Sequence, residues 1–384
     1  MNLNHPNPPE SEKDDFVQLC EIALKKLNLY RSHIKFIIMK RYKDDTRREF
    51  LRKLIAGTSM MGLAPVMASI KGCGETVPGV KLPQRPFGQT GETVGLYSLG
   101  AQATVEQVGM KDQAIEIVNR CIDLGINYID TSAWYGMNGN SSEGDDLRGT
   151  SERHVGEVMK TRRDEVFLAT KTHDRSYDGA MKHLESSLKN LQTDIIDLWQ
   201  IHNIKGGGDE DIDRIFADDG VIKALEKAKD EGIVRFLGIT GHADPAPMLT
   251  LIERYPFDTV LMALNAADKH HNSFIENLLP HAVEKNMGII GMKIPARDRI
   301  FSNGGIITMK EAMSYTLTLP VSTIIVGIDR IAELEENIRI AQEFEPLTED
   351  EMLAIENKVK PHHEHLMFYK GLSDWPAEWS GNNV

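Results

Sequence analysis

The sequence predicts an α/β protein whose strands and helices form a parallel (β/α)8 barrel. Short apolar runs of strand type alternate regularly with segments whose apolar residues recur at helical spacing. Three successive runs also end in residues suited to acid–base chemistry: Asp130 with Tyr135, then Lys171, then His202. In a parallel barrel the carboxyl ends of the strands lie side by side on one face, where such barrels carry their chemistry. The regular alternation and the polar strand ends therefore predict the same fold.

The number of elements agrees with a closed barrel. Strand-like runs are found at residues 94–99, 126–130, 165–170, 195–201, 234–239, 258–262, 288–292 and 322–326. Helical patterns are found near residues 112–124, 152–161, 178–191, 219–231, 246–254, 273–285, 308–318 and 330–343. Eight strands and eight helices are what closure requires, and right-handed crossovers between parallel strands then fix the topology.

Segments on both sides of the barrel complete the predicted domain organisation. A barrel takes about 250 residues, so a chain of 384 residues holds one barrel with extensions. We place the barrel at 81–347, opened by a hairpin whose turn lies between Arg85 and Glu92. The extension 348–384 starts with a capped helix and carries Trp375 and Trp379, which either line a pocket or close a surface groove.

The residues at the three strand ends form a set with a definite chemical use. Tyrosine has an ordinary pKa of about 10, which is too high for easy proton donation at neutral pH. A lysine ammonium close to Tyr135 favours the phenolate and lowers that pKa, and a carboxylate keeps the lysine charged and in place. Tyr135 could then act as general acid towards a carbonyl oxygen, with His202 orienting the carbonyl.

This stretch resembles the Asp-x-x-x-x-Tyr-Gly signature of the aldo-keto reductases, with Lys171 and His202 at the matching strand ends. The resemblance covers roughly residues 81–347. It implies an NAD(P)-dependent oxidoreductase that reduces an aldehyde or ketone, or oxidises the alcohol, by hydride transfer. It also implies that Asp130, Tyr135, Lys171 and His202 are catalytic, that the hairpin plugs the bottom of the barrel, and that the C-terminal segment contributes to the substrate pocket.

The same resemblance implies where the cofactor, NADP(H) or NAD(H), binds. The implied cofactor-binding residues are Asp130, Thr240, Gly241, Lys293, Gly327, Asp329, Arg330, Glu336 and Asn337. Gly327 would let the backbone approach a phosphate at a helix N-terminus, which favours an anion. Two positions depart from the family pattern: Thr240-Gly241 stands where a Ser-Asn pair is commoner, and Leu261 where a glutamine is usual.

The charges near the adenosine end predict a weaker preference for the cofactor with a 2′-phosphate than the resembling family usually shows. Asp329 and Glu333 stand where the family often has a serine and a cation or glutamine. Carboxylates repel a phosphate, whereas the guanidinium of Arg330 pairs well with one.

Metal and iron–sulfur cofactors are not predicted. The histidines at 270–271 and 362–365 are not joined to a second ligand set at a recognisable spacing. Cys20, Cys73 and Cys121 show no metal or redox spacing, and the cysteine cluster of the iron–sulfur branch of the family is absent. Cys121 is most simply a core thiol.

The N-terminal region 39–80 resembles a twin-arginine export signal with a linker. Arg47-Arg48 precede Phe50-Leu51, then a modestly apolar run from Leu54 to Met67, with a small-residue cleavage site at residues 66–68. This order predicts export to the periplasm through the twin-arginine machinery. The alternatives are a basic helix of a cytoplasmic protein and, on Cys73, a lipid anchor. The apolar run is too short for a stable membrane span.

Residues 1–38 are expected to form an extension that is no domain, and Met39 would be the natural initiator.

The net charge of −13 excludes nucleic acid as a partner, because no long basic stripe remains after the N-terminal segment. Two other functions stay open: a catalytically weak cofactor-binding barrel acting as a redox sensor or partner subunit, and a barrel hydrolase using histidines as metal ligands.

Overall fold

The computed structural model describes residues 82–136, 148–205, 209–301 and 307–373. Several predicted features lie outside these residues: the extension 1–38, the signal segment and linker 39–80, and the two tryptophans of the tail. All described residues except Thr348–Asp350 belong to one compact unit.

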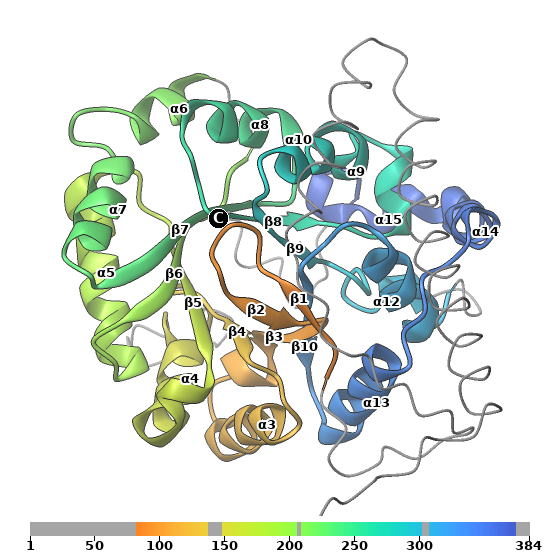
Figure 1. Cartoon of the computed structure of the whole chain (residues 1–384), viewed down its shortest axis with the longest axis horizontal. Coiled ribbons are helices and arrows are strands. Elements are labelled where there is room, and N and C mark those ends of the chain that lie inside the picture. Colours follow the sequence, from red (N-terminus) through yellow and green to blue (C-terminus); the bar gives the residue numbers. More distant parts are fainter. Residues whose placement is uncertain (1–81, 137–147, 206–208, 302–306, 374–384) are drawn as a thin grey trace, which may run out of the picture. The chain divides into compact units, whose positions relative to one another are not determined.

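The predicted barrel is confirmed. Eight parallel strands of the described chain close on themselves, with β10 pairing β3, and Figure 1 shows helices surrounding them. The strands are β3 (Tyr97–Ala103), β4 (Tyr128–Asp130), β5 (Phe167–Thr172), β6 (Ile196–Ile201), β7 (Val234–Gly241), β8 (Thr259–Ala263), β9 (Gly288–Met292) and β10 (Thr323–Ile328). Each strand pairs with the next along the chain, so all carboxyl ends share one face.

The helices follow from apolar residues at helical spacing. They are α3 (Lys111–Asp123), α4 (Thr150–Arg162), α5 (Tyr177–Leu191), α6 (Asp209–Ile215), α7 (Val221–Asp230), α8 (Pro245–Arg254), α9 (Phe274–Asn277), α10 (Leu279–Glu284), α12 (Met309–Thr318), α13 (Ile331–Gln342), α14 (Glu349–Val359) and α15 (His363–Leu366). In α3, for example, the buried side chains are Ala114, Ile117, Val118, Cys121 and Ile122, which form one face. None of the described helices is long and apolar enough to cross a membrane.

Two predicted elements, the helix at 273–285 and the strand at 94–99, differ from the structure. The helix expected at 273–285 is divided into α9 and α10 at Leu278. Pro280 lies at the start of α10, and a proline lacks the N–H needed to continue a helix through that point. The helix α6 was not predicted from the sequence.

The hairpin closes the N-terminal end of the barrel and explains a second difference. β1 (Gln84–Pro86) pairs antiparallel with β2 (Thr93–Gly95), so the run expected at 94–99 divides between the hairpin and β3. At the turn, Phe87 is buried and packs edge-on against Tyr128 and Phe167, with ring centroids 5.6 and 5.3 Å away. Gly88 has φ +58°, and a Cβ there would lie 2.2 Å from the backbone nitrogen of Gly288, so only glycine fits this contact.

Candidate active site

The C-terminal ends of three neighbouring strands bring the predicted catalytic residues together. Asp130 is the last residue of β4, and Lys171 lies near the end of β5. His202 follows β6, and its backbone N–H donates to the carbonyl of Thr172 (2.8 Å). Tyr135 lies in the loop after β4, within hydrogen-bond distance of Lys171. Parallel pairing of β4, β5 and β6 thus assembles residues that are up to 72 positions apart in the sequence, from Asp130 to His202.

Lys171 is the centre of this group. Its side chain is 1% exposed, and its ammonium forms a salt bridge with the Asp130 carboxylate. The ammonium also donates to the carbonyl of Thr131 at 2.7 Å and to the hydroxyl of Tyr135 at 3.3 Å. The other carboxylate oxygen of Asp130 accepts from the Gln200 amide at 2.9 Å. All three donors of the ammonium therefore have a partner, and the lysine is held at one place.

The electrostatics of this group leave Tyr135 protonated. Burial raises the pKa of Tyr135 above its ordinary value; Lys171 lowers this pKa, and Asp130 and Glu106 raise it further. The sequence predicted a net lowering by Lys171, and this expectation is wrong because burial outweighs the lysine. Burial also lowers the pKa of Lys171, but the adjacent Asp130 and Tyr135 outweigh this and raise that pKa overall. The pair is thus an ammonium beside a neutral phenol.

A second histidine, which the sequence analysis missed, contacts the predicted one. The Nε2 atom of His173 lies at hydrogen-bond distance from Nδ1 of His202. The ring of His173 stacks on Trp134 with centroids 4.2 Å apart and planes at 5°. Burial lowers the pKa of His173 to about 2, and burial followed by His173 and Lys171 lowers the pKa of His202. Both rings are therefore neutral at physiological pH.

A cavity of about 540 Å³ opens beside Tyr135, between the C-terminal ends of β3, β9 and β10. Its lining includes Asp130, Tyr135, Lys293, Gly327 and Asp329, five of the residues predicted to act in catalysis or cofactor binding. The volume lies within the range of small-molecule sites.

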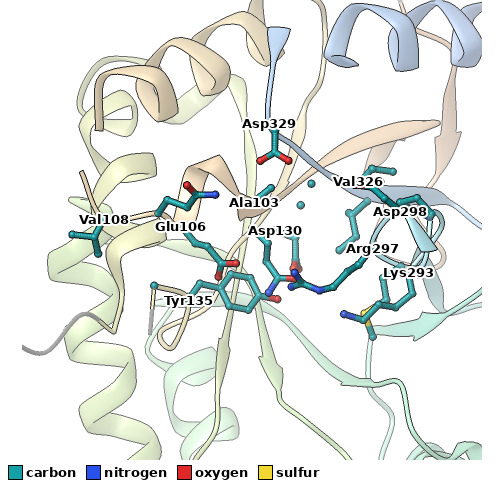
Figure 2. A pocket seen from close by; sticks show the side chains of 18 residues that line it. Ala103, Glu106, Val108, Asp130, Tyr135, Lys293, Arg297, Asp298, Val326 and Asp329 are labelled. Carbon is teal, nitrogen blue, oxygen red and sulfur yellow. The ribbon is translucent and has the colours of Figure 1, made fainter. Parts of the chain in front are cut away.

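Charged groups of opposite sign face each other across this cavity. Figure 2 shows Glu106 beside the ring of Tyr135, with Lys293 on the opposite side and Arg297 reaching between them. Burial raises the pKa of Glu106 to about 7 although Arg297 and Lys293 oppose this. Burial, then Arg297, lowers the pKa of Lys293 to about 7, which Glu106 opposes. Sequence reasoning missed Glu106, which follows the apolar part of β3 in a short 3-10 helix (Thr104–Glu106).

The cations stand on a strained loop. Lys293, Ala296, Arg297 and Asp298, which follow β9, have φ values of 61°, 48°, 52° and 62°. Non-glycine residues seldom adopt this left-handed region, and such strain is concentrated at functional sites. The loop is thereby folded back so that Lys293, Arg297 and Asp298 all line the cavity.

Other predicted cofactor residues lie away from the cavity lining. Thr240 is fully buried near the end of β7, and its hydroxyl makes no hydrogen bond within the described chain. Arg330 is exposed and pairs with Glu333 (2.5 Å) at the start of α13. Glu336 is exposed, whereas Asn337 is buried and its amide donates to the hydroxyl of Tyr97 (3.4 Å).

The family match decides which proteins this site belongs with. The sequence model of the Aldo/keto reductase family matches residues 93–297, more than half of the chain. This chain belongs to the aldo/keto reductase family. It is therefore an oxidoreductase of the class that acts on carbonyl compounds, and the matched segment contains all four predicted catalytic residues.

Two relatives illustrate the similarity of this aldo/keto reductase to characterised proteins. The L-galactose dehydrogenase of Arabidopsis thaliana is 29% identical over 311 residues, which cover 71% of this chain and 92% of the relative. The 6-dehydroglucose reductase of Novosphingobium aromaticivorans is 31% identical over 166 residues, covering 41% and 50%.

Solved structures share the fold. An aldo-keto reductase from Bacillus halodurans, in its holo form, superimposes with a TM-score of 0.59 at 24% identity, covering 72% of this chain and 96% of that one. An aldo-keto reductase from Klebsiella pneumoniae in complex with NADPH gives a TM-score of 0.58 at 21% identity, covering 73% and 96%.

The structure gives a physical reason for one departure of this aldo/keto reductase from the family pattern. A Cβ at Gly241 would lie 2.5 Å from the sulfur of Met248 and 2.7 Å from the carbonyl oxygen of Ile204. A larger residue after Thr240 would therefore need α8 or the β6 loop to move. The close approach of Met248 on α8 and of the Ile204 carbonyl to this position accounts for the glycine.

Histidines of both clusters contact backbone carbonyl groups. Among the described residues, no group of three or more His, Cys, Asp or Glu side chains could hold a metal ion. His270 instead contacts the backbone carbonyl of Glu356 (2.9 Å), and His363 that of Lys360 (2.8 Å). The contact of His270 joins the segment after β8 to α14, whereas that of His363 is local.

Proposed function

We propose that this aldo/keto reductase reduces an aldehyde or ketone with a reduced nicotinamide dinucleotide, or oxidises the corresponding alcohol. The observation that carries the proposal is the contact of the buried Lys171 ammonium with both the Asp130 carboxylate and the Tyr135 hydroxyl. A phenol whose conjugate base would form beside a fixed ammonium is suited to give its proton to a carbonyl oxygen. The names of the two relatives favour a sugar or another hydroxylated carbonyl compound as substrate.

The residues present fit the cofactor. Thr240 Oγ1, Asn203 Oδ1 and Gln200 Oε1 are buried without a hydrogen-bond partner in the described chain, and a carboxamide offers both donors and an acceptor. Asn203 and Gln200 were not predicted and would replace the family's missing asparagine and glutamine. Lys293 and Arg297 would hold the diphosphate. When bound, the cofactor supplies the hydride that the carbonyl carbon accepts.

Each catalytic side chain then has one task. Tyr135 holds a proton at its hydroxyl oxygen and transfers it to the substrate oxygen. Lys171 stabilises the phenolate left behind, because its ammonium is already 3.3 Å from that oxygen. Asp130 raises the pKa of Lys171 and so keeps the ammonium charged. His202 orients the carbonyl through the ring nitrogen that does not face His173.

Tyr135→Phe is expected to lower turnover by about 10²–10⁴-fold, the usual worth of general acid catalysis, while the Kd for the cofactor stays nearly unchanged. The substitution removes the transferable proton and keeps the ring that packs at the cavity wall. Steady-state rates and fluorescence titration of the cofactor measure the two effects. Turnover above about a third of the wild-type value, with hydride transfer shown to limit the rate, would refute the assignment.

Cofactor affinity is expected to fall as the pH rises from 6 to 8. As the pH rises past its pKa of about 7, Lys293 loses a positive charge. Glu106, whose pKa is also about 7, gains a negative charge over the same range. Both changes make the cavity less favourable for a diphosphate. Asp130, Arg297 and Asp329 also line the cavity. The loss of each proton that binding requires weakens the affinity by up to about tenfold per pH unit above the pKa of that group.

The measurement is a series of binding isotherms with NAD⁺, which has no 2′-phosphate to titrate in this range. We expect Kd to increase about tenfold or more between pH 6 and 8, and Lys293→Met to bind weakly with a flatter profile. Lys229→Met is the matched control, because Lys229 pairs with Asp258 (2.9 Å) and does not line the cavity. An unchanged slope in Lys293→Met would show that Lys293 is not the titrating group.

A weak preference for the 2′-phosphorylated cofactor follows from the partners of Arg330. Glu333 accepts from the Arg330 guanidinium (2.8 and 2.5 Å) and from the backbone N–H of Asp329 (3.1 Å). We expect wild-type discrimination below about a hundredfold, which corresponds to ~2.7 kcal/mol. Glu333→Gln keeps an acceptor for the helix cap but removes the charge that competes for Arg330. It should raise the preference about three- to tenfold.

Separate binding isotherms for the two reduced cofactors test this prediction. Glu335→Gln is a matched control on the same helix, since Glu335 pairs with Arg120 instead (2.6 Å). Equal effects of the two substitutions would show that overall charge, and not the partner of Arg330, sets the preference.

We also propose that the protein is exported, already folded, by the twin-arginine route. The support is Arg47-Arg48 ahead of Phe50-Leu51 and the apolar run that follows, together with a cofactor site built from strands far apart in the chain, which cannot exist before folding. Fractionation of the native host should find the protein outside the cytoplasm. Changing both arginines to lysine should retain it inside. An uncleaved, wholly cytoplasmic wild-type protein would refute export.

A further inference from the structure

We propose that His173 is a positioning residue that fixes the tautomer of His202, so that His202 presents an N–H, and not a bare nitrogen, to the carbonyl oxygen of the substrate. The inference rests on the proposed reductase function for its consequence, but the tautomer itself can be measured without any substrate. It is carried by the contact between the two rings and by the atoms that lack partners around them.

The contact between the two rings requires one proton donor. Nε2 of His173 and Nδ1 of His202 are in direct hydrogen-bond contact, and the ring planes meet at 87°. Two neutral imidazoles can bond in two ways, since each ring carries one N–H and one bare nitrogen. Either His173 donates from Nε2, or His202 donates from Nδ1. The choice decides whether Nε2 of His202 bears a hydrogen.

The surroundings of His173 favour the first arrangement. Nδ1 of His173 is buried and has no hydrogen-bond partner among the described residues. If His202 donated, this Nδ1 would have to carry a hydrogen, and a buried N–H without an acceptor is rarer and costlier than an acceptor without a donor. If His173 donates, its Nδ1 is a bare nitrogen. His202 then carries its hydrogen on Nε2.

A doubly protonated ring would remove the distinction, but the charges nearby oppose it. Burial lowers the pKa of His173 to about 2, with Lys171, His183 and Arg175 acting in the same direction. Burial, then His173 and Lys171, lowers the pKa of His202 well below its ordinary value. Each ring thus has a single proton to place.

Neighbouring contacts hold both rings in this arrangement. Trp134 stacks face to face on His173, and it precedes Tyr135 directly. Arg175 donates to the backbone carbonyls of His202 and Asn203, both at 2.9 Å, while its guanidinium pairs with Asp211. His202 is therefore fixed by its backbone and by Nδ1. Only Nε2 remains for a substrate.

The consequence for the reaction is directional. A substrate carbonyl oxygen is an acceptor, and it gains negative charge as the hydride arrives. An N–H from His202 stabilises that oxygen together with the Tyr135 proton, whereas a bare nitrogen would repel it. His173 makes no contact with the substrate in this scheme; it acts through His202.

Two substitutions of His173 separate the hydrogen bond from the stack. His173→Phe keeps an aromatic ring for Trp134 and has no donor for His202. His173→Gln places an amide N–H near the position of Nε2 and so can restore the bond. Both are made in the full chain. Histidine labelled with ¹⁵N reports which ring nitrogen of His202 is protonated, with the His202 signals assigned by their loss in His202→Gln.

We expect wild-type His202 to be protonated on Nε2, His173→Phe to populate the Nδ1–H form, and His173→Gln to return the wild-type pattern. In parallel, kcat/KM for a carbonyl substrate should fall about tenfold to a hundredfold in His173→Phe, less than for outright loss of an oxyanion donor, and recover to within about threefold in His173→Gln. The Kd for the cofactor should stay unchanged in both.

The inference is overturned if wild-type His202 is protonated on Nδ1, or if its spectrum is the same in His173→Phe. A fall in kcat/KM that His173→Gln does not rescue would mean that His173 serves packing alone, which also overturns it. If the wild-type enzyme reduces no carbonyl compound at all, the proposed function fails, while the nitrogen spectra still decide the tautomer.

Discussion

The buried salt bridge between Lys171 and Asp130 is the constraint on which the site depends. Both side chains are 1% exposed, and an ammonium in such a place is tolerated only with an opposite charge and a partner for every donor. Asp130, the Thr131 carbonyl and the Tyr135 hydroxyl satisfy this requirement. Removing either charge would leave the other buried and unpaired, at a cost of about 3–5 kcal/mol. The ion pair of Lys171 and Asp130 thus stabilises the fold and also places an ammonium beside the Tyr135 hydroxyl.

The barrel makes this arrangement possible because it brings distant strand ends together on one rigid face. Asp130 and Lys171 lie on adjacent strands whose register pairs Asp130 with Ala169, and Gln200 on the next strand supports the carboxylate. At the opposite end the hairpin closes the barrel with the buried ring of Phe87. Left-handed φ values cluster in the loop after β9, from which Lys293 and Arg297 line the cavity.

The sequence predicted the fold and the catalytic group because both depend on local patterns. A parallel strand has a fixed direction, so a polar residue after an apolar run must lie at the catalytic end, as Lys171 and His202 do. The remainder depends on tertiary contacts. His173 follows a strand just as visibly, but its role depends on the orientation of two rings. Glu106 is distinguished only by burial opposite Lys293. The helix expected at 273–285 is interrupted because of Pro280, and the spacing of apolar residues does not reveal such a break.

The pKa of Tyr135 shows why the contacts must be weighed against one another. From the sequence, a lysine beside a tyrosine predicts a lowered pKa, yet burial raises it overall. The two effects act at different stages of the proposed reaction. Burial keeps the phenol protonated in the resting site, which a proton donor requires. Lys171 favours the phenolate, and this preference acts only as the proton departs. It therefore stabilises the transition state more than the bound substrate. Without burial, Lys171 alone would lower the pKa of Tyr135 and shift the resting site towards the phenolate.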